Sequence, residues 1–94
     1  MKFDWDDNKA ALNETWHDGV TFQEATTVFD DPYFVVLSDD DHSFYELRYW
    51  IIGESLQGRI LLVVYTERGD LVRIISAREA TPREVKTYEQ EKFR

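Results

Sequence analysis

Residues 58–81 read GRILLVVYTERGDLVRIISAREAT, and this stretch predicts the centre of the fold. The run Ile60–Tyr65 is apolar without a break and rich in β-branched residues, which is typical of a strand covered on both faces. A turn containing Gly69 follows, and Leu71–Ser76 begins a second β-rich run, so the two runs are expected to form a tight hairpin. Four arginines accompany these strands, and any function must account for them: Arg59, Arg68, Arg73 and Arg78.

The position of the turn decides which of these arginines share a face of the hairpin. With residues 68–69 as a two-residue loop, Arg59 and Arg78 face each other on one side. Arg73 then falls on the other side. A bulge, a three-residue loop or a strand that ends early would instead bring Arg73 and Arg78 together, because a shift of one residue exchanges the faces.

Length and composition predict one compact domain, residues 1–94, with a single core. The 94 residues are 43% hydrophobic, and no Gly/Ser-rich or Pro-rich linker divides them. The absence of cysteine excludes a disulfide framework and a thiolate metal site. No segment is long enough for a membrane span, and the acidic N-terminus is unlike a signal peptide, so a cytoplasmic protein with no membrane partner is expected.

The net charge of −8 is unevenly distributed along the chain. Residues 1–58 hold 3 Lys or Arg against 13 Asp or Glu, a net charge of −10, whereas residues 59–94 hold 8 against 6, a net charge of +2. A phosphate backbone could therefore be attracted to the hairpin region while the acidic part attracts a basic protein. A solvated surface with uneven charge is the simpler alternative.

Apolar periodicity and capping signals predict an α+β fold with the element order β-α-α-β-β-β-β-α and a mainly antiparallel sheet. The expected elements outside the hairpin are a strand at 2–5, helices at 7–17 and from 21, strands at 33–37 and 44–55, and a last helix from 81 to about 91. The first two helices should pack on one face of the sheet. Only Val85 and Tyr88 form an apolar face on the last helix, so this helix is expected to pack weakly or to use a partner's surface.

Short motifs through most of the chain resemble one known family. They are Phe3-x-Trp5-Asp6-x-x-Lys9-x-x-x-Asn13, His17, Gly19-Val20-Thr21-Phe22-x-Glu24-Ala25, Val28-Phe29-Asp30-Asp31-Pro32, Asp41-His42-Ser43, Glu46-x-Arg48, Ile51-Ile52-Gly53, Tyr65-Thr66-Glu67-Arg68-Gly69-Asp70 and Arg73-Ile74-Ile75-Ser76-Ala77-Arg78. In this order and spacing they are similar to the BrnT toxin family. The resemblance implies a RelE-like ribonuclease of a type II toxin–antitoxin pair, which arrests translation by cutting RNA. A BrnA-like antitoxin would neutralise it, and DNA would be contacted only through the antitoxin's DNA-binding domain.

The resemblance also implies a metal-independent site with no cofactor. Such RNA cleavage needs a proton acceptor for the 2′-hydroxyl, an acid for the leaving 5′-oxygen, and cations for the charge that develops on the phosphate. The expected catalytic residues are His17 as base or acid, Glu67 as a second base, and Arg68, Arg73 and Arg78 as phosphate clamps. Lys9, Arg59 and Arg83 are expected to bind the substrate.

Each of these residues has a structural alternative. His17 would be favoured near a helix C-terminus whatever the function, and Glu67 suits an ordinary turn. Arg73 could pair with Glu46 or Asp70, and Arg78 with Glu46 or Glu84. The acidic run at 39–42 invites a metal site, but it lacks the alternating ligand positions of a calcium loop.

Several positions depart from the family pattern and motivate a second hypothesis. Trp16 stands where lysine is common, and Glu79, Pro82 and Val85 stand where basic residues are frequent. Asp18 is an additional residue between His17 and Gly19. These departures lower the positive potential, so the alternative function is a catalytically weakened or inactive module that acts only through antitoxin binding and co-repression.

Overall fold

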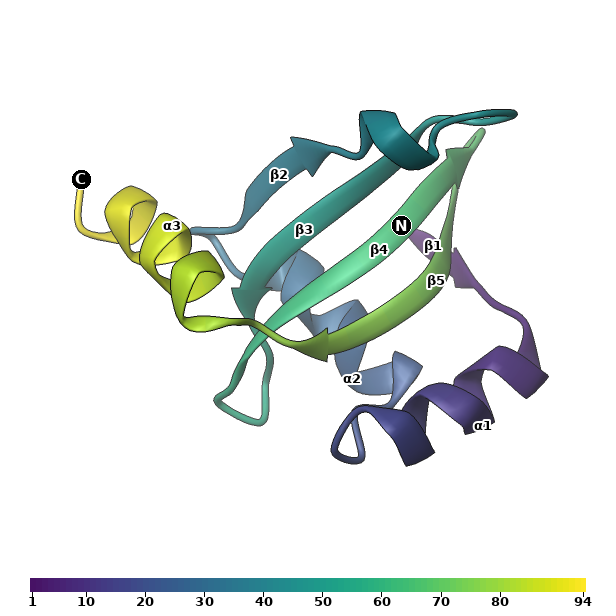
Figure 1. Ribbon diagram of the computed structural model, residues 1–94, viewed down its shortest axis with the longest axis horizontal. Helices are drawn as coiled ribbons and strands as arrows, with labels where there is room; N and C mark the ends of the chain where they lie inside the picture. Colours follow the sequence, from purple (N-terminus) through teal and green to yellow (C-terminus); the bar gives the residue numbers. More distant parts are fainter.

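The computed structural model describes residues 1–94 and shows an α+β fold (Figure 1). The elements are β1 (Lys2–Asp4), α1 (Asp7–Trp16), α2 (Phe22–Thr27), η1 (Val28–Asp30), β2 (Val35–Ser38), η2 (Asp40–His42), β3 (Arg48–Glu54), β4 (Ile60–Arg68), β5 (Leu71–Glu79) and α3 (Pro82–Lys92). The predicted order of strands and helices is therefore confirmed, and the two short 3-10 helices, η1 and η2, are additions. None of the helices has the length and hydrophobicity needed to cross a membrane.

The five strands form one mixed sheet in the order β1-β5-β4-β3-β2. The three pairs β2–β3, β3–β4 and β4–β5 are antiparallel, as short connections require, whereas β1 pairs with β5 in parallel. In the chain, α1, α2 and three strands lie between β1 and β5. This long connection allows β1 to run parallel to β5. The parallel pair is the feature that the predicted, mainly antiparallel sheet did not include.

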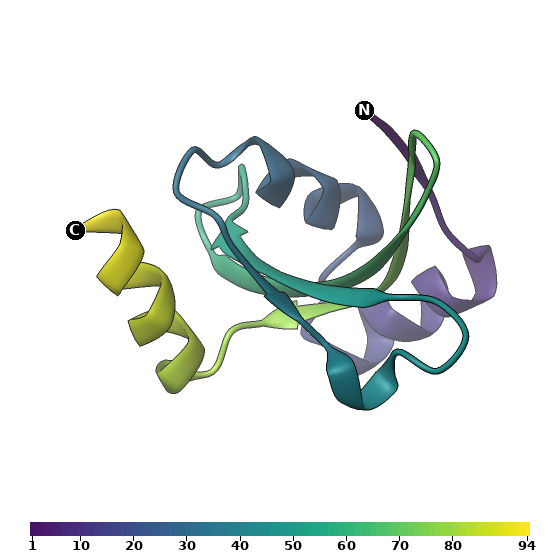
Figure 2. The same cartoon turned by 90° about the horizontal axis from the view of Figure 1, so that it is seen from above.

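The main hydrophobic core lies between one face of the sheet and α2 with η1 (Figure 2). Phe22, Ala25 and Val28 are fully buried there against the central strands. The fit is close at Gly53 of β3, because a Cβ on this residue would come within 2.9 Å of the Val28 side chain. Glycine at this position therefore lets η1 approach the sheet.

Helix α1 lies along the edge of β5 and not flat on the face that α2 covers, in contrast to the prediction for the first two helices. Strand β1 pairs only with the first part of β5, so on that side the backbone further along β5 has no neighbouring strand. Asn13 of α1 reaches this free edge and bonds both backbone groups of Ala77. Ala10 of the same helix packs against the main core.

Helix α3 is docked on the opposite face of the sheet, and the expectation of weak packing is wrong. Tyr88 is 1% exposed and packs with Ile52 and Leu62 in a second small core. Its hydroxyl donates a hydrogen bond of 2.6 Å to Asp31, which also accepts the backbone N–H of Glu54 at 2.7 Å. One buried tyrosine, anchored at both its ring and its hydroxyl, therefore replaces the broad apolar stripe that the sequence lacks.

Candidate functional site

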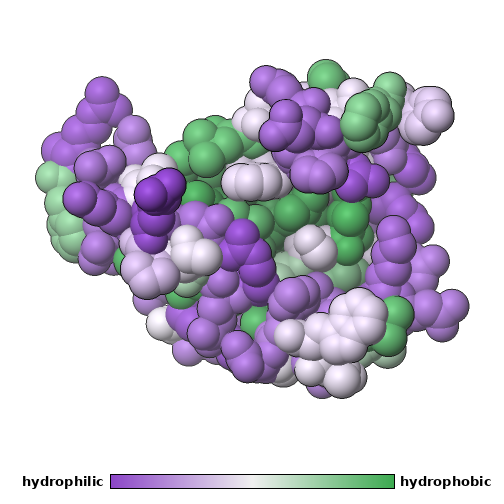
Figure 3. Space-filling view, in the orientation of Figure 1, coloured by the Kyte–Doolittle hydropathy of each residue, from purple (hydrophilic) through white to green (hydrophobic).

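The face of the sheet opposite α2, which we call the open face, is covered by α3 at one end only. At that end Tyr88 packs on Leu62, and beyond it Trp50 and Val64 are only partly buried. Figure 3 shows this face as a hollow with an apolar floor between polar rims. A sheet face that is hollowed and only partly covered is suited to bind a ligand.

A bulge in β5 places Arg73 and Arg78 on the open face together. Arg73 is paired with Thr66 across the hairpin and Arg78 with Leu62, and the register shifts between these two pairs. Ile75 is the extra residue, because it has no partner on β4. Without it the two arginines would point to opposite faces. The alternative in which a bulge unites the two arginines is therefore the one the structure shows.

The turn of this hairpin lies one residue further along than the two-residue loop considered from the sequence. Arg68 pairs with Leu71, so the loop is Gly69-Asp70, with Gly69 at a φ of 61°. Glu67 then lies opposite Val72, on the face that carries α2. The predicted facing of Arg59 and Arg78 is wrong, because Leu62 is the partner of Arg78.

Most arginines on the open face are held by carboxylates. Arg68 pairs with Glu46 at 3.1 Å, Arg73 pairs with Asp4, and Arg78 pairs with Glu84 at 2.7 Å. Arg48 of β3 is the exception, since it forms no ion pair. Arg48 is therefore the strand arginine whose guanidinium is free for an anionic ligand.

The pair formed by Arg78 and Glu84 ties the open face to α3. Two parallel hydrogen bonds of 2.7 and 2.9 Å join the guanidinium to the carboxylate, and Glu84 also accepts the backbone N–H of Thr81 at 2.9 Å. Thr81 and Glu84 form a capping box at the start of α3. The hydrogen bonds from Arg78 hold the pKa of Glu84 below its ordinary value even though burial raises it. Glu84 is thus an ionised partner that occupies Arg78.

One hollow of about 280 Å³ gathers the chemistry of the open face. The polar side chains that line it are Asp39, His42, Arg48, Ser76 and Arg78, and its floor includes Trp50 and Leu62. We call it the arginine hollow. His42 comes from η2, Arg48 from β3, and Ser76 and Arg78 from β5, so three separate segments contribute these polar groups. Two guanidinium groups, one unpaired, together with an imidazole make this hollow a candidate phosphate site.

His42 is oriented by a buried carboxylate. Its Nδ1 lies 3.0 Å from Oδ1 of Asp39, whose residue is 7% exposed, whereas the His42 side chain is 62% exposed. Burial raises the pKa of Asp39, but hydrogen bonds from His42 and the Trp50 side chain, with the nearby charges of His42 and Arg48, lower it overall. The carboxylate is therefore ionised at neutral pH and accepts a hydrogen bond from the imidazole.

His17 lies in a neighbouring hollow of about 310 Å³, between α1 and β5. Lys9 and Trp16 line this α1 hollow with it, and Ile75 and Ser76 belong to both hollows. The bulged segment of β5 therefore separates His17 on one side from His42 on the other. The structure thus brings predicted residues Lys9 and His17 next to the region of Arg78.

Two other predicted site residues lie elsewhere. Glu67 lines an apolar hollow of about 380 Å³ on the opposite face, among residues such as Phe29 and Tyr65. Arg83 is exposed on the first turn of α3 and lines none of the hollows described. Neither lies beside the arginine hollow.

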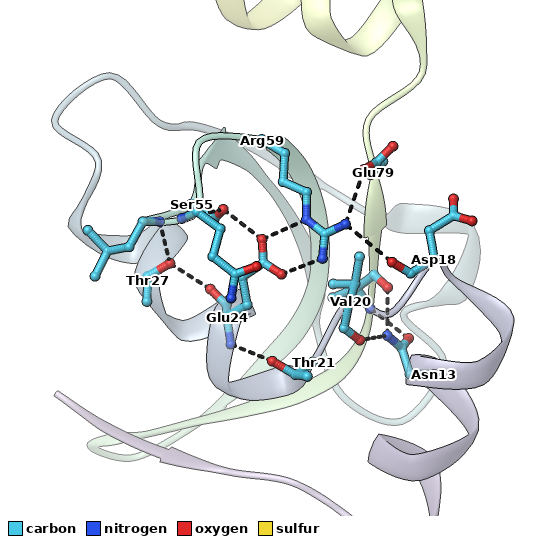
Figure 4. Close-up of polar contacts among 12 residues, drawn as sticks. Asn13, Asp18, Val20, Thr21, Glu24, Thr27, Ser55, Arg59 and Glu79 are labelled. Atoms are coloured by element: carbon cyan, nitrogen blue, oxygen red, sulfur yellow. Dashed lines mark hydrogen bonds and ion pairs between the residues drawn. The ribbon is translucent and has the colours of Figure 1, made fainter.

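Arg59, predicted to bind substrate, is instead part of a partly buried ion-pair network (Figure 4). Its guanidinium bonds Glu24 at 2.6 and 2.9 Å, Glu79 at 3.2 Å and the carbonyl oxygen of Asp18 at 3.2 Å. Glu24 is 4% exposed, and the hydrogen bonds from Arg59 hold its pKa below the ordinary value although burial raises it. The prediction that Arg59 binds substrate is overturned because its guanidinium is taken up by Glu24. This carboxylate accepts hydrogen bonds from Arg59 and Ser55 and does not close a capping box with Thr21.

Sequence reasoning did not assign His42 or Arg48 to the site. Both stand in motifs that carry the family resemblance, but nothing in their spacing indicates that η2 and β3 bring them to Arg78. No group of three or more His, Cys, Asp or Glu side chains is arranged to hold a metal ion, and this includes the acidic run at 39–42.

Comparison with known proteins gives a family match and a structural match. Residues 5–84 match the family described as ribonuclease toxin, BrnT, of type II toxin-antitoxin system. The crystal structure of the Brucella abortus ribonuclease toxin, BrnT, superposes with a TM-score of 0.65 at 25% sequence identity, covering 86% of this chain and 97% of that chain. No match was found among curated proteins.

Proposed function

The chain belongs to the BrnT family of ribonuclease toxins of type II toxin–antitoxin systems, and from this premise we propose that it is an endoribonuclease that cuts RNA on its open face. The observation that carries the proposal is the arginine hollow, in which unpaired Arg48 lies with Arg78 beside an exposed imidazole. RNA phosphates are recognised by guanidinium groups through paired hydrogen bonds. The arginine hollow offers such groups from two strands, β3 and β5.

In this proposal Arg48 and Arg78 hold the scissile phosphate and offset the charge that develops on it. Arg73 and Arg68 extend the basic surface along the hairpin toward the turn, where they would contact neighbouring phosphates. Lys9 would do the same from the α1 hollow. His17, at the C-terminal end of α1 in the neighbouring α1 hollow, would give a proton to the leaving 5′-oxygen. Side chains thus provide the cations and the acid that metal-independent cleavage requires.

The toxin would act in the cytoplasm, where cutting RNA arrests translation. Membership of a type II system implies an antitoxin partner, and we propose a BrnA-like antitoxin that covers the open face. The strongly acidic N-terminal part of the chain, with a net charge of −10 over residues 1–58, would favour a basic partner. DNA would be contacted through the antitoxin alone.

The test is cleavage of RNA by the purified chain in the presence of a chelator. Arg48→Ala and Arg78→Ala should each lower kcat/KM by about 10²-fold or more, the usual cost of removing one group that stabilises transition-state charge. Arg94→Ala is the matched control, because Arg94 is 78% exposed and pairs only with Glu91. Intact RNA in the presence of folded wild-type protein would rule out the activity. Equal cleavage by all four proteins would rule out the site.

A second candidate function is a non-catalytic module that keeps antitoxin binding and co-repression. One observation favours it: Arg68, Arg73 and Arg78 are all paired with carboxylates, which compete with phosphate. Expression in cells without the partner separates the two candidates. Growth arrest that Arg48→Ala relieves supports the toxin, whereas unaffected growth at equal protein level supports the binding module.

A further inference from the structure

We propose that His42, oriented by Asp39, is the general base of the cleavage reaction. This inference rests on the proposed ribonuclease function and adds a catalytic residue to it. His42 lines the arginine hollow, so its imidazole lies on the same hollow as the two guanidinium groups that would hold the scissile phosphate. A proton acceptor must lie beside the bound phosphate in this reaction, because the attacking 2′-hydroxyl belongs to the adjacent ribose.

The contact with Asp39 decides which nitrogen of His42 can exchange protons. An ionised carboxylate only accepts hydrogen bonds, so the 3.0 Å contact requires Nδ1 to carry hydrogen. In the neutral imidazole the lone pair is then on Nε2, away from Asp39. This arrangement, a base whose second nitrogen is held by a buried acid, is the one that orients catalytic histidines in general.

Several hydrogen bonds that hold this loop do not involve the imidazole. The Ser43 hydroxyl donates to the Asp39 carbonyl oxygen at 2.6 Å and accepts the backbone N–H of Arg48 at 3.0 Å. The backbone N–H of Asp39 in turn donates to the Arg48 carbonyl oxygen at 2.8 Å. Asp39, Ser43 and Arg48 therefore hold the segment in place without His42. His42 is also a hydrogen-bond partner of the buried Asp39 carboxylate, so the experiment below must separate this structural role from catalysis.

The step is balanced as follows. Nε2 of His42 accepts the proton of the 2′-hydroxyl while the 2′-oxygen forms a bond to phosphorus. The bond between phosphorus and the 5′-oxygen breaks, and this oxygen takes a proton from protonated His17. The products are a 2′,3′-cyclic phosphate and a 5′-hydroxyl end, with His42 protonated and His17 neutral. Exchange of one proton with water at each imidazole restores the starting state.

The experiment measures cleavage of two RNA substrates by wild-type protein, His42→Ala and the neighbouring variant Asp41→Asn. One substrate is natural RNA, and the other carries a 5′-sulfur at the cleaved linkage, which leaves without protonation. His42→Ala should lose about 10²- to 10⁴-fold in kcat on both substrates, because neither can react without loss of the 2′-hydroxyl proton. His17→Ala should lose activity on natural RNA and regain it on the sulfur substrate.

Further measurements separate catalysis from binding. Binding of an RNA with 2′-deoxy sugars, which cannot be cut, should change less than about threefold in His42→Ala. Asp39→Asn should lower kcat while KM stays the same, as expected for a positioning residue. Asp41 is exposed and does not line the hollow, so Asp41→Asn should cleave within about twofold of wild type.

Three results would overturn the inference. Unchanged cleavage by His42→Ala would remove His42 from the reaction while leaving the ribonuclease function intact. Rescue of His42→Ala by the sulfur substrate would make it the acid and not the base. An inactive wild-type protein would overturn the proposed function and this inference together, and this outcome is recognised by the wild-type reaction alone.

Discussion

Asn13 of α1 bonds both backbone groups of Ala77 of β5: its Nδ2 donates to the carbonyl oxygen at 2.8 Å, and its Oδ1 accepts the N–H at 3.0 Å. The same Nδ2 donates to the carbonyl oxygen of Val20 at 3.0 Å. A side-chain amide thus takes the place of a neighbouring strand where β1 has ended, and it holds α1 beside the α1 hollow. An edge strand that is satisfied in this way presents no free backbone groups at that point.

Asn13→Ala should destabilise the fold by about 2–4 kcal/mol, because three buried backbone groups lose their partner. The free energy of unfolding from urea titration measures this change. Asn8→Ala is the matched control, since Asn8 is on the same helix, exposed, and makes no side-chain hydrogen bond. If Asn13→Ala lowers the free energy of unfolding no more than Asn8→Ala does, then water replaces Asn13 as the hydrogen-bond partner of the β5 backbone.

Arg59→Met should lower the free energy of unfolding by on the order of 3 kcal/mol, because it leaves the carboxylate of Glu24 buried without its cation. Adding Glu24→Gln to this variant removes the uncompensated charge and should recover part of the loss. Arg94→Met, at an exposed pair, should change stability by less than about 0.5 kcal/mol. Equal effects of the two arginine substitutions would contradict a stabilising role for the buried pair.

Stability should fall on acidification through the range where buried carboxylates take up protons. The pKa of Glu24, Asp31 and Glu84 is lowered in the folded protein, so their contribution is present above the ordinary carboxyl values of 3.8–4.5 and is lost as the pH falls through the lowered ones. Urea midpoints measured at several pH values below about 5 should decrease steadily. Asp31→Asn should show a shallower decrease, and an unchanged slope would exclude Asp31 from the effect.

Glu84→Gln should raise the affinity for uncleavable RNA by a few-fold, about 0.5–1 kcal/mol, if Arg78 binds phosphate. The substitution removes the charge that occupies the Arg78 guanidinium, while glutamine still completes the capping box with Thr81. Glu89→Gln makes the same change of charge at an exposed position of α3. Fluorescence anisotropy compares the two variants, and equal affinities would indicate a general charge effect without a role for Arg78.

Tyr88→Phe should weaken the docking of α3 by about 1 kcal/mol, because the ring stays buried while the hydrogen bond to Asp31 is lost. Hydrogen exchange over residues 82–92 measures the docking directly and should be faster in the variant than in wild type. Exchange at the wild-type rate would show that the ring alone, packed on Ile52 and Leu62, holds the helix.

Local patterns in the sequence determined the elements and most of the core. Apolar alternation, capping residues and turn glycines depend on neighbouring residues only, so the order of strands and helices was predicted correctly. The spaced motifs identified the family, and the match over residues 5–84 confirms it. The strand predicted at 44–55 was too long, because residues 44–47 precede the paired segment Arg48–Glu54.

Only the tertiary structure decided how the site is assembled. The bulge at Ile75 unites Arg73 and Arg78, and it depends on which β4 residues pair with β5, a choice that the residues of one strand do not reveal. Helix α3 docks through one tyrosine whose partner, Asp31, is distant in the chain.

The ion-pair partners of the arginines also depend on the tertiary structure. From sequence, an arginine on a strand has several carboxylates within reach, and only the packed chain shows that Arg59 pairs with Glu24 while Arg48 forms no ion pair. His42 was passed over for a related reason, since its place beside the arginines follows from the path of η2 across the open face. Residue types and their order are local information, whereas the partners of side chains that are distant in sequence are set by the packing of the whole chain.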